Sequence, residues 1–250
     1  MSITPSERRT LIPRPDQPLP TGDDKTRSVQ AMFDVIAPRY DLVNRVMTFR
    51  MDVGWRRRTV DTLGLSPGSV VVDLACGTGD LAHELADRWL VPVGVDLSFG
   101  MLAAAPRRFP RLQADGASLP FPDASVDGAT CGFALRNFTD LGLTLAELGR
   151  VTRDGGRIAL VEVAEPPNPV LRFGHRVYFG QVVPRIGGLL SDGDAYRYLP
   201  RSVAYLPEPA ELRAMVERAG FTDVRRTLLS GGIAQLITAT RVDRDGRTSA

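Results

Sequence analysis

The sequence predicts an α/β fold with a doubly wound, mostly parallel seven-stranded sheet that ends in an antiparallel hairpin. Between Val70 and Val163, short apolar runs alternate with segments of helical period, which is typical of parallel strands covered by helices on both faces. The last two strands are joined only by Ser230–Gly232, a link that suits a hairpin and not a parallel crossover. N-terminal helices and a helical cap insertion complete the prediction.

The region before the sheet is predicted to be a tail followed by helices. Residues 1–25 are rich in proline and charge and are expected to be disordered. Apolar residues at helical spacing predict helices from about Val29, over Tyr40–Val46 and over Val53–Leu63. We assign residues 26–241 to one domain and expect residues 242–250 to be a flexible tail.

Seven strands are predicted from continuous apolar runs and their flanking turns. They are Val70–Leu74, Val91–Val95, Arg111–Ala114, Val126–Gly132, Arg157–Val163, Val224–Leu229 and Ile233–Thr240. Asp140 is expected to cap the helix that precedes the fifth strand. Residues 168–207 break the strand–helix alternation and are expected to form the cap insertion, and Pro209 and Gly220 bracket the last helix.

Composition narrows the classes of function. The formal net charge is +2, so bulk charge gives no argument for a nucleic-acid partner. Cys76 and Cys131 have neither metal-type nor redox-type spacing, which favours a reducing, cytoplasmic setting, and His83 and His175 show no metal-ligand spacing. We therefore expect no metal site. No apolar run approaches the roughly 20 residues that a membrane-spanning helix needs.

A glycine-containing turn follows the first strand and is the strongest candidate for a ligand site. Val70–Asp80 reads VVVDLACGTGD, with Asp73 at the end of the strand and Gly77 and Gly79 in the turn. Glycines at such a turn let a ligand approach the backbone closely. The pattern G-x-G-x-x-A also fits a nicotinamide or flavin site, and a turn without any ligand is the plainer alternative.

Two further acidic residues decide between cofactors. Asp96 ends the second strand and can accept hydrogen bonds from both ribose hydroxyls of an adenosine, or it can cap the helix at Ser98. Asp115 follows the third strand and can accept from an adenine amino group beside Gly116, or it can be a plain turn aspartate. With Asp73, these carboxylates are expected to line one crevice, which suits a cationic sulfonium better than a pyrophosphate.

Several longer motifs resemble one family. They are MFDVIAPRYDLVN (Met32–Asn44), FALRNFTD (Phe133–Asp140), ELGRVTRDGGRIALVE (Glu147–Glu162), AYRYLPRSV (Ala195–Val203) and SGGIAQLITATR (Ser230–Arg241). Together with VVVDLACGTGD, they resemble class I methyltransferases and, more specifically, the ubiquinone/menaquinone biosynthesis C-methyltransferases. The resemblance covers about Val29 to Arg241.

The resemblance implies a site for S-adenosylmethionine and an acceptor. It implies that Thr78, Asp96, Asp115 and Gly116 contact this cosubstrate, and that the acceptor is a prenylated quinol, demethylmenaquinol above all. The family often has a serine where this chain has Gly132, the last position that we place at the cosubstrate. Thr48–Arg58 reads TFRMDVGWRRR and also departs from the family, so another small lipophilic phenol remains an alternative acceptor.

Methylation of an aromatic carbon needs alignment, exclusion of water and an electron-rich ring. Arg136 and Asn137 follow the fourth strand, where a guanidinium could stabilise phenolate-like charge or form a salt bridge within the fold. Tyr40 could hydrogen-bond a substrate oxygen or pack the N-terminal helices, and His175 could be a base or a surface residue of a helix. The catalytic candidates are therefore Arg136, Asn137 and Tyr40.

The cap sequence suggests where the acceptor comes from. Pro169–Leu190 mixes apolar residues with Arg172, Arg176 and Arg185, which suits an amphipathic lid on a membrane, with an ordinary core-packing helix as the alternative. The expected partners are the prenylated demethylquinol and a second copy of the chain. We also expect peripheral contact with the inner face of the cell membrane. A protein that binds S-adenosylmethionine without turnover, an RNA methyltransferase and a nicotinamide oxidoreductase are the less favoured classes.

Overall fold

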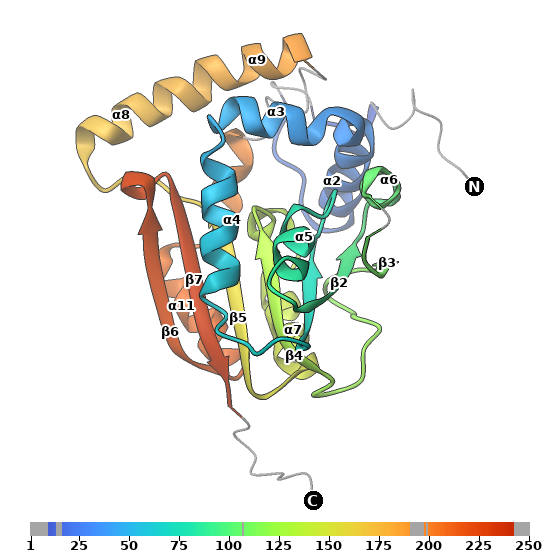
Figure 1. The fold of residues 1–250 in the computed structure, drawn as a ribbon. Helices are drawn as coiled ribbons and strands as arrows, with labels where there is room; N and C mark the ends of the chain where they lie inside the picture. The colour runs from blue at the N-terminus through green and yellow to red at the C-terminus, as the bar shows by residue number, and fades with distance from the viewer. Residues whose placement is uncertain (1–9, 14–16, 107, 191–197, 199, 243–250) are drawn as a thin grey trace, which may run out of the picture.

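A seven-stranded sheet with strand order β3-β2-β1-β4-β5-β7-β6 forms the centre of the computed structural model (Figure 1). The structure describes residues 10–13, 17–106, 108–190, 198 and 200–242. The strands are β1 (Val70–Leu74), β2 (Val91–Asp96), β3 (Arg111–Gln113), β4 (Val126–Gly132), β5 (Thr152–Val163), β6 (Phe221–Leu229) and β7 (Ala234–Arg241). The predicted number and order of strands along the chain are confirmed.

The sheet is parallel except at β7. β1 pairs in parallel with β2 and β4, β2 with β3, and β4 with β5. β7 lies antiparallel between β5 and β6, so the predicted terminal hairpin is confirmed. β5 begins five residues earlier than predicted because Thr152 already pairs with Val126, ahead of a register shift.

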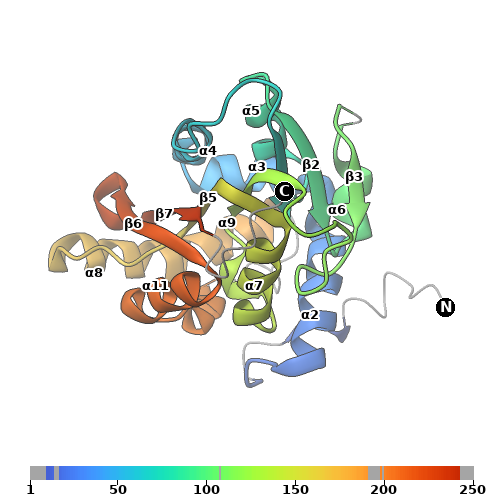
Figure 2. The same cartoon turned by 90° about the horizontal axis from the view of Figure 1, so that it is seen from below.

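Helices cover both faces of the sheet, as the alternating pattern predicted. The α-helices are α2 (Gly22–Ile36), α3 (Tyr40–Met47), α4 (Met51–Asp61), α5 (Asp80–Ala86), α6 (Phe99–Ala104), α7 (Leu141–Val151), α8 (Pro169–Val177), α9 (Val183–Leu190) and α11 (Pro209–Arg218). Figure 2 shows α4 and α5 on one face and α7 and α11 on the other. The Asp140 side chain caps α7 by accepting from the Leu143 N–H at 2.9 Å, as predicted.

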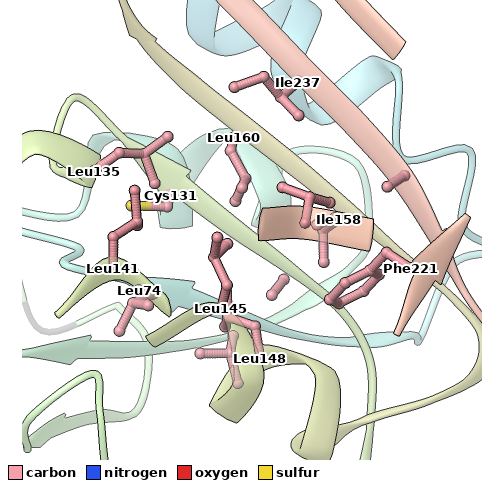
Figure 3. Close-up of a cluster of buried hydrophobic side chains, with 14 of the residues drawn as sticks. Leu74, Cys131, Leu135, Leu141, Leu145, Leu148, Ile158, Leu160, Phe221 and Ile237 are labelled. Carbon is pink, nitrogen blue, oxygen red and sulfur yellow. The ribbon is translucent and has the colours of Figure 1, made fainter. Parts of the chain in front are cut away.

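The main core lies between the sheet and the α7–α11 face. Leu145 and Leu148 of α7 pack near Ile158 and Leu160 of β5, with Phe221 at the edge (Figure 3). Alternate residues of a strand point to opposite faces, so the neighbouring Ala159 and Val161 of β5 pack in the second cluster, with α4 and α5. This two-sided burial is why β5 reads as a continuous apolar run.

The N-terminal boundary differs from the prediction. Helix α2 begins at Gly22, inside the segment expected to be a disordered tail, and Ile12 is buried in a cluster with Met32 and Ile36. Lys25 anchors the first turn of α2 because its Nζ donates to the Phe138 carbonyl at 2.7 Å. Residues 1–9 and 14–16 of the predicted N-terminal tail, residues 243–250 of the C-terminal tail, and residues 195–197 and 199 of the AYRYLPRSV motif lie outside the described residues.

Residues 169–190 of the predicted cap insertion form a long helical rod across one end of the sheet (Figure 1). α8 continues through a π-helical turn at Tyr178–Val182 into α9. The Tyr178 hydroxyl donates to the Met47 carbonyl at 2.8 Å, which ties the rod to α3. Among the helices of the described residues, none is long and apolar enough to cross a bilayer.

Candidate functional site

A cavity of about 280 Å³ lies at the carboxyl ends of the central strands, under α2. Five of the predicted cosubstrate residues line it: Gly77, Asp96, Asp115, Gly116 and Gly132. The catalytic candidates Tyr40 and Asn137 also line it. The carboxyl ends of parallel strands meet at one edge, and this shared edge brings together residues that are distant in sequence.

Asp96 organises the turn beside this cavity. Its carboxylate accepts from the Gly77 N–H and from the Ser98 N–H, both at 2.8 Å. Burial raises the pKa of Asp96 to about 6, against the opposing effect of these hydrogen bonds. Capping of α6 itself is done by the Ser98 hydroxyl, which accepts from the Met101 N–H, so the helix-cap alternative for Asp96 holds only in part.

Asp115 and Gly116, which follow β3, also line the cavity. Asp115 is exposed, and its Oδ1 accepts from the Ala117 N–H at 2.9 Å, as the turn-aspartate alternative predicted. Gly116 is buried, and a Cβ there would lie 3.1 Å from the Phe138 ring. At Gly132 a Cβ would lie 2.9 Å from Leu81 Cδ1, so the present packing leaves little room for the serine of the family.

Three of the predicted cosubstrate residues lie outside this cavity. Asp73 and Thr78 line a smaller adjoining cavity of about 30 Å³, so the single crevice expected for the three aspartates is divided. Thr78 donates to Asp41 Oδ1 at 2.5 Å, a partner that the motif does not predict. Packing and backbone conformation both favour glycine at position 79, because a Cβ there would lie 2.4 Å from the Phe109 ring and its φ is +91°.

Asp73, which lines the small adjoining cavity, has a deeply buried carboxyl group. It is 1% exposed, and its Oδ1 accepts from the Thr130 hydroxyl at 2.8 Å. Its Oδ2 has no hydrogen-bond partner among the described residues. Burial raises the pKa of Asp73 to about 7, with Asp96 adding to the effect, so its charge is only partly present at neutral pH.

A second cavity, of about 380 Å³, adjoins the first and is mostly apolar. Its walls come from α3, α4 and the cap helix α8, with Arg136 on one side. Phe33, Tyr40 and Phe133 line both cavities and therefore mark the place where they meet. Burial raises the pKa of Tyr40, so its hydroxyl keeps its proton at neutral pH.

Arg136 forms the salt bridge that was one of its two predicted roles. Its Nη1 pairs with Glu162, which is fully buried, and donates to the Phe133 carbonyl at 2.7 Å. Its Nε donates to the Ser202 hydroxyl at 3.1 Å. Arg136 nevertheless lines the larger cavity, so the second predicted role needs a separate test.

Asn137 differs from its neighbour in having no internal partner. Both side-chain amide atoms are buried and make no hydrogen bond within the described part of the chain. Since unpaired buried polar groups are costly, this amide is a candidate for pairing with a ligand at the cavity wall.

Sequence reasoning missed some polar residues of the larger cavity. Asp52 and Arg56 form an ion pair there, and Arg56 also lies 3.1 Å from Asp80 at the start of α5. Their i,i+4 spacing could have indicated the pair, but the predicted helix begins at Val53, one residue after Asp52. His175 also lines this cavity instead of facing away from it, its Nε2 is buried without a partner among described residues, and burial lowers its pKa.

No group of three or more His, Cys, Asp or Glu side chains among the described residues is placed to hold a metal ion. Cys76 and Cys131 are both buried and unpaired with each other.

Comparisons with solved structures agree on the fold. A SAM-dependent methyltransferase of Thermotoga maritima aligns with a TM-score of 0.61 and 19% identity, over 85% of this chain and 99% of that one. Phosphoethanolamine N-methyltransferase 2 of Haemonchus contortus, solved in complex with S-adenosyl-L-methionine, aligns with a TM-score of 0.56 and 12% identity, over 88% of this chain and 59% of that one. These likenesses confirm the class I methyltransferase fold.

Sequence comparisons identify the family. A demethylmenaquinone methyltransferase of Thermus thermophilus is 45% identical over 215 residues, which are 82% of this chain and 97% of the relative. The ubiquinone/menaquinone biosynthesis C-methyltransferase UbiE of Syntrophotalea carbinolica is 42% identical, over 86% and 94% of the two chains. The model of the ubiE/COQ5 methyltransferase family matches residues 21–241. This chain therefore belongs to the ubiE/COQ5 methyltransferase family.

Proposed function

We propose that this protein methylates a ring carbon of a prenylated quinol, converting demethylmenaquinol into menaquinol with S-adenosylmethionine as the methyl donor. The observation that carries the proposal is the junction of two different cavities, one with carboxylates and an amide, the other mostly apolar. The names of the relatives at 42% and 45% identity support the same acceptor.

The smaller cavity has the features that the cosubstrate requires. A Cβ at Gly77 would have no atom within 4 Å, so the turn leaves open space beside its backbone. Asp96 and Asp115 offer carboxylates to the adenosine, and Asn137 offers an unpaired amide. Bound there, S-adenosylmethionine supplies a methyl group already activated by the sulfonium charge, and this chemistry calls for no metal ion.

The larger cavity would hold the acceptor ring. As the methyl–sulfur bond breaks and the carbon–methyl bond forms, the quinol hydroxyl loses its proton. The methylated carbon then loses its hydrogen as a proton and the oxygen is protonated again, so one proton is released overall. Tyr40, at the junction, donates a hydrogen bond to the ring oxygen, and the Arg136 guanidinium opposes the negative charge on that oxygen. The apolar walls exclude water, which strengthens both interactions.

The role of Arg136 can be separated from its salt bridge. Replacing Arg136 with Met leaves Glu162 buried without its partner, which should cost about 3–5 kcal/mol of stability. Adding Glu162→Gln should restore most of the melting temperature. If Arg136 acts on the acceptor, turnover stays roughly 10²–10³ lower in the double variant. Recovery of turnover together with stability would show a structural role alone.

An apolar face beside the larger cavity supports contact with a membrane. Phe49, Phe173 and Leu189 are 71%, 72% and 85% exposed, and α9 packs beside α3. The rod from Pro169 to Leu190 contains three arginines and no acidic residue, which suits anionic lipid. A prenyl tail could then pass from the bilayer into the cavity, whose wall includes α8.

Vesicle flotation tests this face. Phe173→Ser with Leu189→Ser should weaken binding to anionic vesicles at least tenfold, because each side chain buries apolar area worth roughly 1.5 kcal/mol or more. Trp89→Ser removes a side chain that is 79% exposed just before β2, at the opposite edge of the sheet, and is the matched control. Equal loss in all variants would contradict the assignment. A homodimer and a cytoplasmic location remain predictions, the first testable by light scattering.

The central experiment is incubation with labelled S-adenosylmethionine and a panel of reduced quinones. We expect label on demethylmenaquinol and little on benzoquinols or phenols without a prenyl tail. A second candidate, methylation of another lipophilic phenol, is favoured by one observation: Thr48, Phe49, Met51 and Asp52, all in the stretch that departs from the family, line the larger cavity. Labelling of such a phenol in preference to the quinol would select this alternative.

A further inference from the structure

Phe133 has an unusual backbone conformation at the junction of the two cavities. Its φ is +58°, the left-handed region that bulky residues rarely adopt. The residue directly follows β4 and lies in the FALRN stretch. Strain of this kind persists only where the surroundings enforce it, and it concentrates at functional sites.

Two hydrogen bonds hold this conformation from opposite sides. The Phe133 N–H donates to the Val161 carbonyl at 2.7 Å, which extends the pairing of β4 with β5 by one residue. The Phe133 carbonyl accepts from Arg136 Nη1 at 2.7 Å. Because Arg136 is itself paired with buried Glu162, the strained peptide is attached to the most buried ion pair of the site.

The ring of Phe133 is fixed as well as its backbone. Its centroid lies 5.9 Å from that of Trp55, with an interplanar angle of 51°, and Arg56 Cζ lies 5.9 Å from the ring centroid. The side chain is only half-buried, since it forms part of the wall of both large cavities. A flat, rigid, partly open aromatic surface therefore faces the place where a donor and an acceptor would meet.

We propose that the Phe133 ring is the platform on which the acceptor's aromatic ring lies during methyl transfer. The proposal rests on the proposed function, since it assigns a residue to the acceptor ring. Offset stacking of two rings defines a plane and a separation, which leaves the acceptor carbon few orientations toward the cosubstrate cavity. The strained backbone at Phe133 then serves to orient the ring toward the junction of the cavities. Alignment of the acceptor carbon with the methyl group lowers the activation barrier for methyl transfer.

Substitutions that separate ring shape from apolar volume test the platform. Phe133→Tyr keeps a ring, and turnover should stay within about threefold. Phe133→Leu keeps an apolar side chain without a flat face, and kcat should fall at least tenfold with a raised KM for the quinol. The dissociation constant for S-adenosylmethionine, measured by calorimetry, should stay within about twofold in both variants.

Acceptor binding can be read without turnover. The chain has two tryptophans, so Trp89→Phe leaves Trp55, which is in contact with Phe133, as the single reporter. Oxidised demethylmenaquinone should quench this fluorescence, and Phe133→Leu in the same background should weaken the quinone's dissociation constant at least fivefold. Phe133→Tyr is the matched control and should bind within about twofold of the parent.

The backbone strain has its own readout. Glycine adopts positive φ freely, so Phe133→Gly should melt about 2–4 °C above Phe133→Ala, although both lack the ring. Equal melting temperatures for Phe133→Gly and Phe133→Ala would show that the backbone at this position is not strained. Unchanged quinone binding and kinetics in Phe133→Leu would overturn the platform. If the parent enzyme methylates no quinol, the proposed function fails, whereas a quinol-active enzyme indifferent to Phe133→Leu rejects the platform alone.

Discussion

The buried carboxyl group of Asp73 should make the stability of this protein depend on pH in an unusual direction. In the unfolded chain its pKa is near 3.8, while burial raises it to about 7 in the folded state. The folded protein therefore holds this proton between about pH 4 and pH 7 when the unfolded chain has lost it. Because the folded state binds more protons than the unfolded state within this window, the free energy of unfolding falls as pH rises through it. Above the window both states have lost the proton, and Asp73 causes no further change.

The magnitude follows from the shift in pKa. One unit corresponds to 1.36 kcal/mol, so a shift of about three units gives an upper bound of about 4 kcal/mol over the whole window. Between pH 5 and pH 8 about two of these units are crossed, which leaves about 2–3 kcal/mol. For a domain of this size, the loss corresponds to about 5–10 °C in melting temperature.

Asp73→Asn removes the ionisation and keeps an oxygen that can accept from Thr130. Thermal melts from pH 5 to pH 8 should show a steeper decline for the parent protein than for this variant. The difference between the two profiles is the quantity of interest, because other titrating groups contribute equally to both. Asp115→Asn, a change at an exposed aspartate, is the control. Parallel profiles for the parent and Asp73→Asn would refute the reasoning.

Other outcomes follow from the same geometry. Asp96→Ala should weaken S-adenosylmethionine binding by roughly 1–3 kcal/mol in calorimetry, and affinity of the parent should also fall as pH drops through about 6 and protonates Asp96. An equal dissociation constant in the folded variant would exclude Asp96 from the cosubstrate. Gly79→Ala should lower stability by roughly 1–3 kcal/mol because of Phe109, while Gly174→Ala, in open helical space, should raise it. Asn137→Ala should keep its melting temperature, since the amide has no internal partner, yet lose at least tenfold in turnover.

The fold was predictable because its elements obey simple periodicities. β1 and β5 read as apolar runs since both of their faces are covered, and the short link before β7 forces an antiparallel pair. The N-terminal boundary was not predictable by the same means. Gly22–Lys25 is polar and charged, and its helix is stabilised by tertiary contacts such as the one between Lys25 and the Phe138 carbonyl.

Site residues could be predicted from the sequence where strand topology alone determines their position. They could not be predicted where side-chain packing determines it. Strand order brings Asp96 and Asp115 to one cavity, because both follow parallel neighbouring strands. The same rule fails for Asp73, whose side chain points into the interior toward Thr130. No local pattern indicates that Glu162, 26 residues after Arg136, is its buried partner.

The positions at which this sequence departs from the family can be located in the structure. The stretch before Trp55 differs from the family, and its differences are not confined to the surface. Thr48, Phe49 and Met51 line the larger cavity, as does the cap helix α8. The turn beneath the smaller cavity retains Gly77 with Asp96 accepting from its N–H. Most of these departures lie at the cavity that we assign to the acceptor, while Gly132 is the departure at the cosubstrate cavity, so the choice of ring is the property that we expect to differ from the family. The quinone panel is therefore more informative about this protein than any further test of the fold.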